Sequence, residues 1–174
     1  EESVRELRGD ASQGDIQTKM EIKLDAYLPA EYVPNDQMRI EIYKKIAAID
    51  GASARADLIE ELIDRFGEPT RPVMNLIDVA HLKGLCGRLG IDSVALRNGQ
   101  LAMRFSPGAQ LDPQRLLAAL SRYKKELTLQ AGAPTFLLFK AGNRPADELI
   151  RLCVPVMEDV ADAVLKEDEH AKTV

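Results

Sequence analysis

Residues of alternating character run from position 16 to position 25. One set of alternate positions holds only charged or amide side chains. The other set is Ile16, Thr18, Met20, Ile22 and Leu24. Successive side chains of a strand point to opposite faces of its sheet, so this period of two predicts a half-buried strand.

Apolar residues then recur every three or four positions, which predicts two amphipathic helices between residues 36 and 66. Pro29 and Pro34 come first and indicate an extended turn, because proline disfavours helix at the residue before it. Asn35 or Asp36 is expected to cap the first helix, Ser53 to cap the second and Gly67 to end it. The inward positions should be Met38, Ile42, Tyr43, Ile46 and Ile49, followed by Leu58, Ile59, Leu62, Ile63 and Phe66.

A third helix is expected to begin near Pro72, since proline is favoured in a first turn, and to run to Gly90. Gly84 and Gly87 weaken its second half by about 1 kcal/mol each relative to alanine. We therefore expect either a closely packed neighbour at these glycines or an irregular helix.

The second half of the chain combines strands and helices. Asn98-Gly99 separates the runs 91–97 and 100–105 and predicts a hairpin, because both turn residues need positive φ. Asp112 and Pro113 should start a helix that reaches about Tyr123, and a last helix should span 145–166. Residues 126–130 and 135–140 have the pattern of two more strands. The order strand, three helices, hairpin, helix, two strands, helix predicts an α+β fold, with a small and largely antiparallel sheet packed against several helices.

The pattern also suggests how the chain is divided. Residues 1–15 have the composition of a linker or of the tail of a preceding helix, and residues 167–174 that of a flexible tail. Residues 16–166 should form a single domain. The sequence begins without methionine, and we interpret it as a fragment of a longer protein.

Composition narrows the possible functions. The formal net charge is −5, the pI is about 5.2 and only 5% of residues are aromatic, with no tryptophan. A domain that binds phosphate backbones is usually basic, and one that stacks bases needs aromatic residues, so this composition does not favour nucleic-acid binding. No apolar run approaches the ~18 residues of a membrane span. Cys86 and Cys153 lie in apolar helical patterns and should be buried, reduced thiols. These features predict a cytoplasmic protein without membrane contact.

Residues that could carry catalysis are sparse. The only histidines are His81 and His170, and His81 has just Asp78 nearby in the chain as a possible hydrogen-bond partner, which does not make a metal site. There is no nucleophile elbow and no glycine-rich phosphate loop. We therefore expect no catalytic residues, cofactor or metal in this chain, and any ATP chemistry should lie outside it.

Acidic pairs occur on two predicted helices. Glu158, Asp159 and Asp162 are expected to lie on a solvated face. Glu61 and Asp64 are three residues apart and therefore side by side on one helix face, with Arg65 exposed near the glycine that ends the helix. Such a rigid acidic pair could complement arginines of a partner, and an ordinary solvated surface is the alternative.

Two segments resemble a known family. The runs DAYLPAEYVPNDQMRIEIYKKIA and ELIDRFG, followed by PVMNLIDVAHLKGLCGRLGI, are similar to the C-terminal domain of bacterial transcription-repair coupling factors. The residues that match the first motif are Asp25, Ala26, Leu28, Pro29, Tyr32, Val33, Pro34, Asn35, Arg39, Ile40, Tyr43, Lys44, Lys45, Ile46 and Ala47. Those that match the second are Glu61, Leu62, Asp64, Arg65, Phe66 and Gly67.

The resemblance implies a role without catalysis in this chain. The whole factor would be an ATP- and magnesium-dependent DNA translocase that displaces stalled RNA polymerase and recruits nucleotide excision repair through UvrA. Its C-terminal domain would be regulatory and autoinhibitory, masking the UvrA-binding module of the same protein. On this interpretation Glu61, Asp64 and Arg65 would contact that module.

Two other hypotheses are open. The chain could be a nucleic-acid-binding accessory module that uses Arg115, Arg122, Lys124 and Lys125. It could also be an enzyme of unknown class, which would require a pocket with carboxylates of perturbed pKa.

Overall fold

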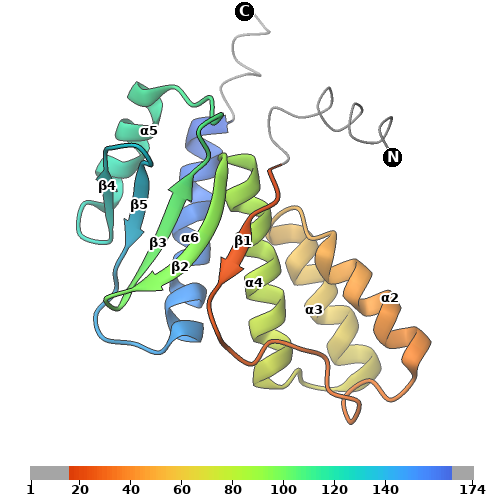
Figure 1. Ribbon diagram of the computed structural model, residues 1–174. Helices are drawn as coiled ribbons and strands as arrows, with labels where there is room; N and C mark the ends of the chain where they lie inside the picture. The colour runs from red at the N-terminus through yellow and green to blue at the C-terminus, as the bar shows by residue number, and fades with distance from the viewer. Residues whose placement is uncertain (1–15, 166–174) are drawn as a thin grey trace, which may run out of the picture.

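The computed structural model describes residues 16–165, in which one five-stranded sheet packs against helices (Figure 1). The strands are β1 (Lys19–Glu21), β2 (Ile91–Arg97), β3 (Gln100–Phe105), β4 (Leu127–Gln130) and β5 (Phe136–Phe139). Their order across the sheet is β1-β2-β3-β5-β4. Only β1 and β2 are parallel, and every other neighbouring pair is antiparallel. The predicted α+β fold with a largely antiparallel sheet is confirmed.

The α-helices of the described residues are α2 (Asp36–Ala47), α3 (Ala52–Phe66), α4 (Arg71–Arg88), α5 (Pro113–Leu120) and α6 (Ala146–Leu165). A short 3₁₀ turn, η1 (Ser121–Tyr123), follows α5. Helices α4, α5 and α6 lie on one face of the sheet, behind it in Figure 1, whereas α2 and α3 stand to its side. None of these helices is both long and apolar enough to cross a lipid bilayer.

Two hydrophobic cores meet at α4. The first half of α4 contributes Val73 and Ile77 to a core shared with α2 and α3. Its second half contributes Leu82 and Leu85 to a larger core shared with the sheet, α5 and α6. Burial of apolar area is the main force that holds such layers together, so α4 is the element that fixes the α2–α3 pair to the rest of the domain.

Several local predictions are confirmed by backbone geometry. The hairpin turns at Asn98 (φ 52°) and Gly99 (φ 76°), and α3 ends at Gly67 (φ 86°). The side chain of Asn35 accepts a hydrogen bond from the Met38 N–H at 3.0 Å and caps α2. Asp112 caps α5 in the same manner.

Helix α4 is regular at both glycines, and only Gly87 marks close packing. A side chain at Gly87 would place its Cβ 2.6 Å from the carbonyl oxygen of Ile16. At Gly84 a Cβ would lie 3.5 Å from the carbonyl oxygen of Ile49, which is ordinary contact. The chain before β1 therefore approaches α4 closely at Gly87.

Some predictions were wrong in detail. Only Lys19–Glu21 pairs as a strand, although the alternation of burial continues to Leu24. Ser53 does not cap α3, which begins one residue earlier after Gly51 and receives its cap from another helix. Tyr43 and Ile63 were expected to face inward but are 40% and 38% exposed.

Other predictions lie outside the described residues. These are the linker at 1–15, the tail at 167–174, residue 166 at the end of the last helix, and His170.

Candidate functional site

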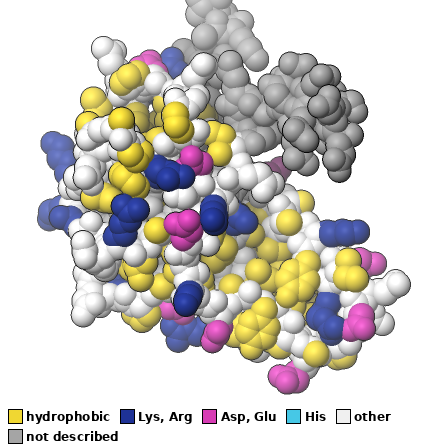
Figure 2. Space-filling model, viewed as in Figure 1, with side chains coloured by type: hydrophobic (Ala, Val, Ile, Leu, Met, Phe, Trp, Pro, Cys, Tyr) yellow, Lys and Arg dark blue, Asp and Glu magenta, His cyan; other side chains and the backbone are white. Residues whose placement is uncertain are grey.

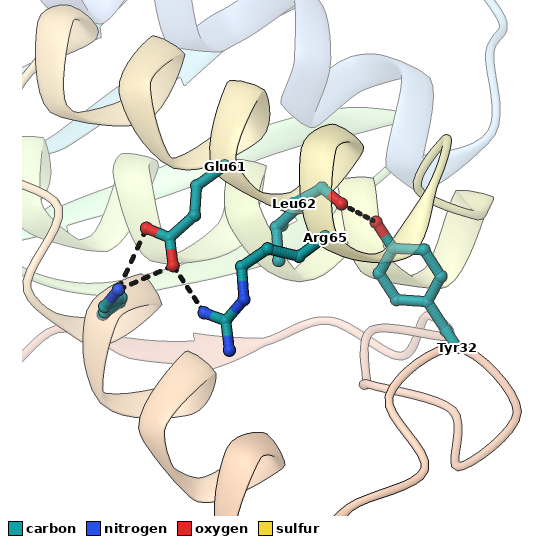
Figure 3. A network of polar contacts seen from close by, with 5 residues as sticks. Tyr32, Glu61, Leu62 and Arg65 are labelled. Atoms are coloured by element: carbon teal, nitrogen blue, oxygen red, sulfur yellow. Dashed lines mark hydrogen bonds and ion pairs between the residues drawn. The ribbon is translucent and has the colours of Figure 1, made fainter.

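An aromatic residue of the loop before α2, Tyr32, contacts the C-terminal end of α3. The Tyr32 hydroxyl donates to the carbonyl oxygen of Gly67 at 2.8 Å. It also lies 3.4 Å from the carbonyl oxygen of Leu62, which is the contact drawn in Figure 3. Its ring contacts that of Phe66, with centroids 5.7 Å apart. Burial raises the pKa of the Tyr32 phenol, and the nearby Glu68 carboxylate raises it further, so the hydroxyl stays protonated and can donate. The polar side of α3 is therefore presented from a fixed helix end.

Glu61 is paired within the domain. Its two carboxylate oxygens lie 2.7 and 2.9 Å from the Lys45 Nζ of α2, and one of them accepts from the Arg65 guanidinium at 2.7 Å (Figure 3). The hydrogen bond from Lys45 and then that from Arg65 lower the pKa of Glu61. Glu61 is thus a carboxylate between two cations, one of which belongs to a different helix.

Asp64 is the unpaired member of the acidic pair. Its side chain is exposed and makes no hydrogen bond or ion pair with any residue between 16 and 165. Arg65 is engaged twice, by Glu61 and by the Phe66 ring, whose centroid lies 5.0 Å from the guanidinium carbon. The structure therefore brings Glu61 and Arg65 together and leaves the Asp64 carboxylate available.

Lys45 could not be predicted as part of this surface. It lies 16 residues before Glu61, and a pairing of that separation depends on how α2 and α3 pack. The i to i+4 spacing of Glu61 and Arg65 is the one local signal in the cluster.

The basic residues of the nucleic-acid hypothesis lie on α5 and just after it, and two of them face carboxylates. The Arg122 guanidinium lies 3.3 Å from both carboxylate oxygens of Asp159, and the Tyr123 hydroxyl donates to Asp159 at 2.6 Å. Arg115 lies 3.6 Å from the Asp112 carboxylate. Lys124 and Lys125 are exposed. Two of the four proposed phosphate-binding cations are therefore already opposite carboxylates.

The prediction of a solvated face is wrong for Glu158, whose side chain is 24% exposed, whereas that of Asp159 is 39% exposed but paired within the domain. Glu158 accepts a hydrogen bond from the first N–H of α3, at Ala52 (3.2 Å), and lies 2.8 Å from the buried His81 ring. Asp159 joins α6 to the turn after α5. Both residues therefore link elements of the fold.

His81 bonds this glutamate and not Asp78, the partner that its position in the sequence suggested. Asp78 instead accepts from the Arg55 guanidinium at 2.7 Å. Among residues 16–165 no three or more His, Cys, Asp or Glu side chains gather into a possible metal site. Both cysteines are buried there as free thiols.

Comparison with known proteins identifies the family. The profile of the TRCF domain matches residues 22–116. The chain belongs to the TRCF domain family. In this TRCF domain, the matched range contains α2, α3, α4 and the acidic surface described above.

Relatives of this TRCF domain are whole transcription-repair coupling factors. The factor of Staphylococcus epidermidis is 35% identical over 114 residues, or 64% of this chain and 10% of the relative. That of Bacillus subtilis is 24% identical over 165 residues, or 92% of this chain and 14% of the relative. The chain therefore spans only a small part of the length of these relatives.

A solved structure supports the same assignment. The crystal structure of the C-terminal domain of a transcription-repair coupling factor is similar with a TM-score of 0.76 and 25% identity. The match covers 89% of this chain and 98% of that chain. This chain is thus similar over most of its length to the C-terminal domain of a transcription-repair coupling factor.

Proposed function

We propose that this domain is a regulatory, autoinhibitory module that masks the UvrA-binding module of the factor to which it belongs. The contact would be made by the polar side of α3 around Asp64, Glu61 and Arg65. Support comes from the geometry of this surface and from the family membership of the chain. RNA polymerase and UvrA would be partners of the whole factor, and the domain would act on them indirectly.

The activity of the whole factor is part of the same proposal. As a transcription-repair coupling factor it would translocate on DNA in the cytoplasm at the expense of ATP, with magnesium, and displace stalled RNA polymerase. That motor would lie outside the 174 residues of this chain, whose own part would be binding without a cofactor.

The observation that carries the proposal is the free Asp64 carboxylate beside a paired Glu61. A partner arginine that meets Asp64 forms a new charge-assisted pair, worth about 1 kcal/mol at a partly solvated interface. An arginine that meets Glu61 must displace Lys45, so it exchanges one pair for another and gains little. Asp64 should therefore contribute more to the contact than Glu61.

Lys45 should therefore compete with the partner for the Glu61 carboxylate. Because it holds Glu61 from α2, its removal should leave the Glu61 carboxylate open to the partner. A contact of this kind is also readily reversed, since only a few kcal/mol must separate the masked and unmasked states.

The proposal can be tested by titrating this domain with the isolated UvrA-binding module. Asp64→Arg should weaken binding by about tenfold or more and Glu61→Arg by less, because repulsion replaces attraction at the contact. Lys45→Met should strengthen it. Asp57→Arg is the matched control, since Asp57 is exposed on the same helix about 10 Å away along its axis.

Two results would contradict the proposal. One is equal weakening by the Asp57 and Asp64 variants, which would indicate a general charge effect. The other is no measurable binding of the unaltered domain to the module, even when the two are joined by a flexible linker that raises their effective concentration to the millimolar range.

A further inference from the structure

The sheet carries helices on one face only. The face that bears Leu101, Met103, Leu137 and Phe139 packs against the helices, and these side chains are at most 1% exposed. The opposite face points toward the viewer in Figure 1, and no element within residues 16–165 lies over it. We call it the open face. It is distinct from the polar side of α3.

The strand register shows which side chains form the open face. Ala95, Ala102, Leu138 and Thr128 follow one another across four strands, and Ser93, Arg104, Phe136 and Gln130 form the next row. Paired residues of neighbouring strands point to the same face. The centre of the face is thus apolar, with Leu138 and Phe136 half-buried beside two alanines. Figure 2 shows hydrophobic side chains interspersed with Lys and Arg on this side.

Two cations on this face have no carboxylate partner among the described residues. The Arg97 guanidinium carbon lies 4.9 Å from the centroid of the Phe136 ring, on which the guanidinium stacks. Lys140 is exposed one position after the buried Phe139, so alternation places it on the open face beyond Leu138. In a chain with a net charge of −5, this makes a local patch of opposite sign.

A hollow of about 1000 Å³ opens where these strands end. Its lining is mainly apolar and includes Phe105, Pro107, Leu111, Leu116, Leu129 and Pro134. The Asp92–Arg104 ion pair, with 2.9 Å between Nε and Oδ1, belongs to the same lining. Arg104 reaches the rim of this hollow from the open face, whereas Phe105 and Leu129 line it from the helix-bearing side of the sheet, so a segment on the open face must turn over the strand ends to fill it. Its volume is in the range of sites that accept small organic groups, roughly 300–1,000 Å³.

We propose that the open face is a second docking surface, which binds a short acidic segment of a protein partner with a bulky apolar side chain in the hollow. Carboxylates of the segment would pair with Arg97 and Lys140. A guanidinium stacked on an aromatic ring keeps its N–H groups free for bidentate pairing with a carboxylate. The acidic remainder of the domain repels such a segment elsewhere, which directs it to this face.

A nucleic acid strand fits the same surface less well. Binding of single strands uses several aromatic platforms and a continuous basic track, and the open face has one aromatic ring, that of Phe136. Two of its four basic side chains are opposite carboxylates: Lys19 lies 3.7 Å from Glu21, and Arg104 is bonded to Asp92. Only Arg97 and Lys140 therefore remain for anions, which is enough for a short segment but does not make a continuous track for a phosphate backbone.

The test is a fluorescence-anisotropy titration of the 174-residue chain with a labelled peptide of alternating Glu and Leu around a central Phe. The peptide should bind, and Arg97→Glu with Lys140→Glu should weaken binding by about tenfold or more. Lys83→Glu with Arg88→Glu, two exposed cations of α4 without a carboxylate partner among residues 16–165, should leave the affinity within about twofold. A peptide with Gly in place of Phe should bind more weakly, because it cannot fill the hollow.

Further measurements check that each variant is folded and locate the bound peptide. Thermal melts of each variant establish that it is folded, which is expected because all four substituted side chains are exposed. Amide chemical-shift changes should map to β5 and the hollow, and not to α3. The proposal is overturned if the peptide does not bind, if both double variants weaken it equally, or if a labelled oligo-dT strand binds more tightly than the peptide.

Discussion

Gly84 and Gly87 lie three residues apart on α4, and alanine at these two positions should change stability in opposite directions. Both glycines are helical and both forgo roughly the same intrinsic helix propensity. What differs is the space that a methyl group would enter. Comparing the two alanine variants therefore separates the cost of glycine in helix propensity from its role in close packing.

The magnitudes follow from two distances. At Gly84 the new Cβ would lie 3.5 Å from the Ile49 carbonyl oxygen, an ordinary contact, so the gain in helix propensity of about 1 kcal/mol should be realised nearly in full. At Gly87 the Cβ would lie 2.6 Å from the Ile16 carbonyl oxygen. A backbone atom cannot rotate away, and forcing an atom into a packed site costs about 1–3 kcal/mol. After the same gain in propensity, Gly87→Ala should be destabilising by up to about 2 kcal/mol.

Urea denaturation of the 174-residue chain and of both variants measures this directly, since the midpoint and slope give the free energy of unfolding. Gly84→Ala should raise the midpoint and Gly87→Ala should lower it, with unchanged slopes. Stabilisation by both substitutions would refute the inference that the chain before β1 packs tightly on α4. A changed slope for Gly87→Ala alone would place the effect in the denatured state instead.

Three further predictions concern Tyr123, Glu158 and the two buried cysteines. Tyr123→Phe should lower the free energy of unfolding by about 1 kcal/mol at neutral pH, because the Tyr123 hydroxyl stabilises the Asp159 carboxylate and lowers its pKa. This difference should persist at any pH above the ordinary aspartate pKa of 3.8. It should vanish as the pH falls through the lower pKa of Asp159 in the folded state. Glu158→Ala should cost about 2 kcal/mol in urea unfolding, because the first N–H of α3 and a buried histidine lose their acceptor, and Glu158→Gln, which keeps an acceptor oxygen, should recover part of that loss. Burial raises the pKa of Cys86 to about 12 and that of Cys153 well above its ordinary value, so thiol reagents at neutral pH should label the chain only as fast as it unfolds; prompt labelling of the native protein would contradict the burial of both thiols.

The secondary structure could be predicted from the sequence because its signals are local. Asn98-Gly99, Gly67 and the Asp112-Pro113 pair each act on their own turn of chain, and each was found where expected. The same reasoning could not show that β1 would pair with β2, because the two are separated by three helices.

The links between elements could not be predicted, because they join residues far apart in the chain. Glu158 and His81 are 77 residues apart, and Lys45 and Glu61 are 16 apart. A glutamate on an amphipathic helix looks the same in sequence whether it faces solvent or another helix. For this reason the sequence predicts a solvated face for Glu158, and it does not indicate that Glu61 pairs with Lys45.

The central claim is that the polar side of α3 masks the UvrA-binding module. Its most direct test is the affinity of the full-length coupling factor for UvrA, with and without Glu61→Ala and Asp64→Ala, and with Asp57→Ala as control. The account predicts that the double variant binds UvrA about fivefold or more tightly, while the melting temperature of the domain and the affinity of the control are unchanged. An unchanged UvrA affinity of the folded double variant would contradict it.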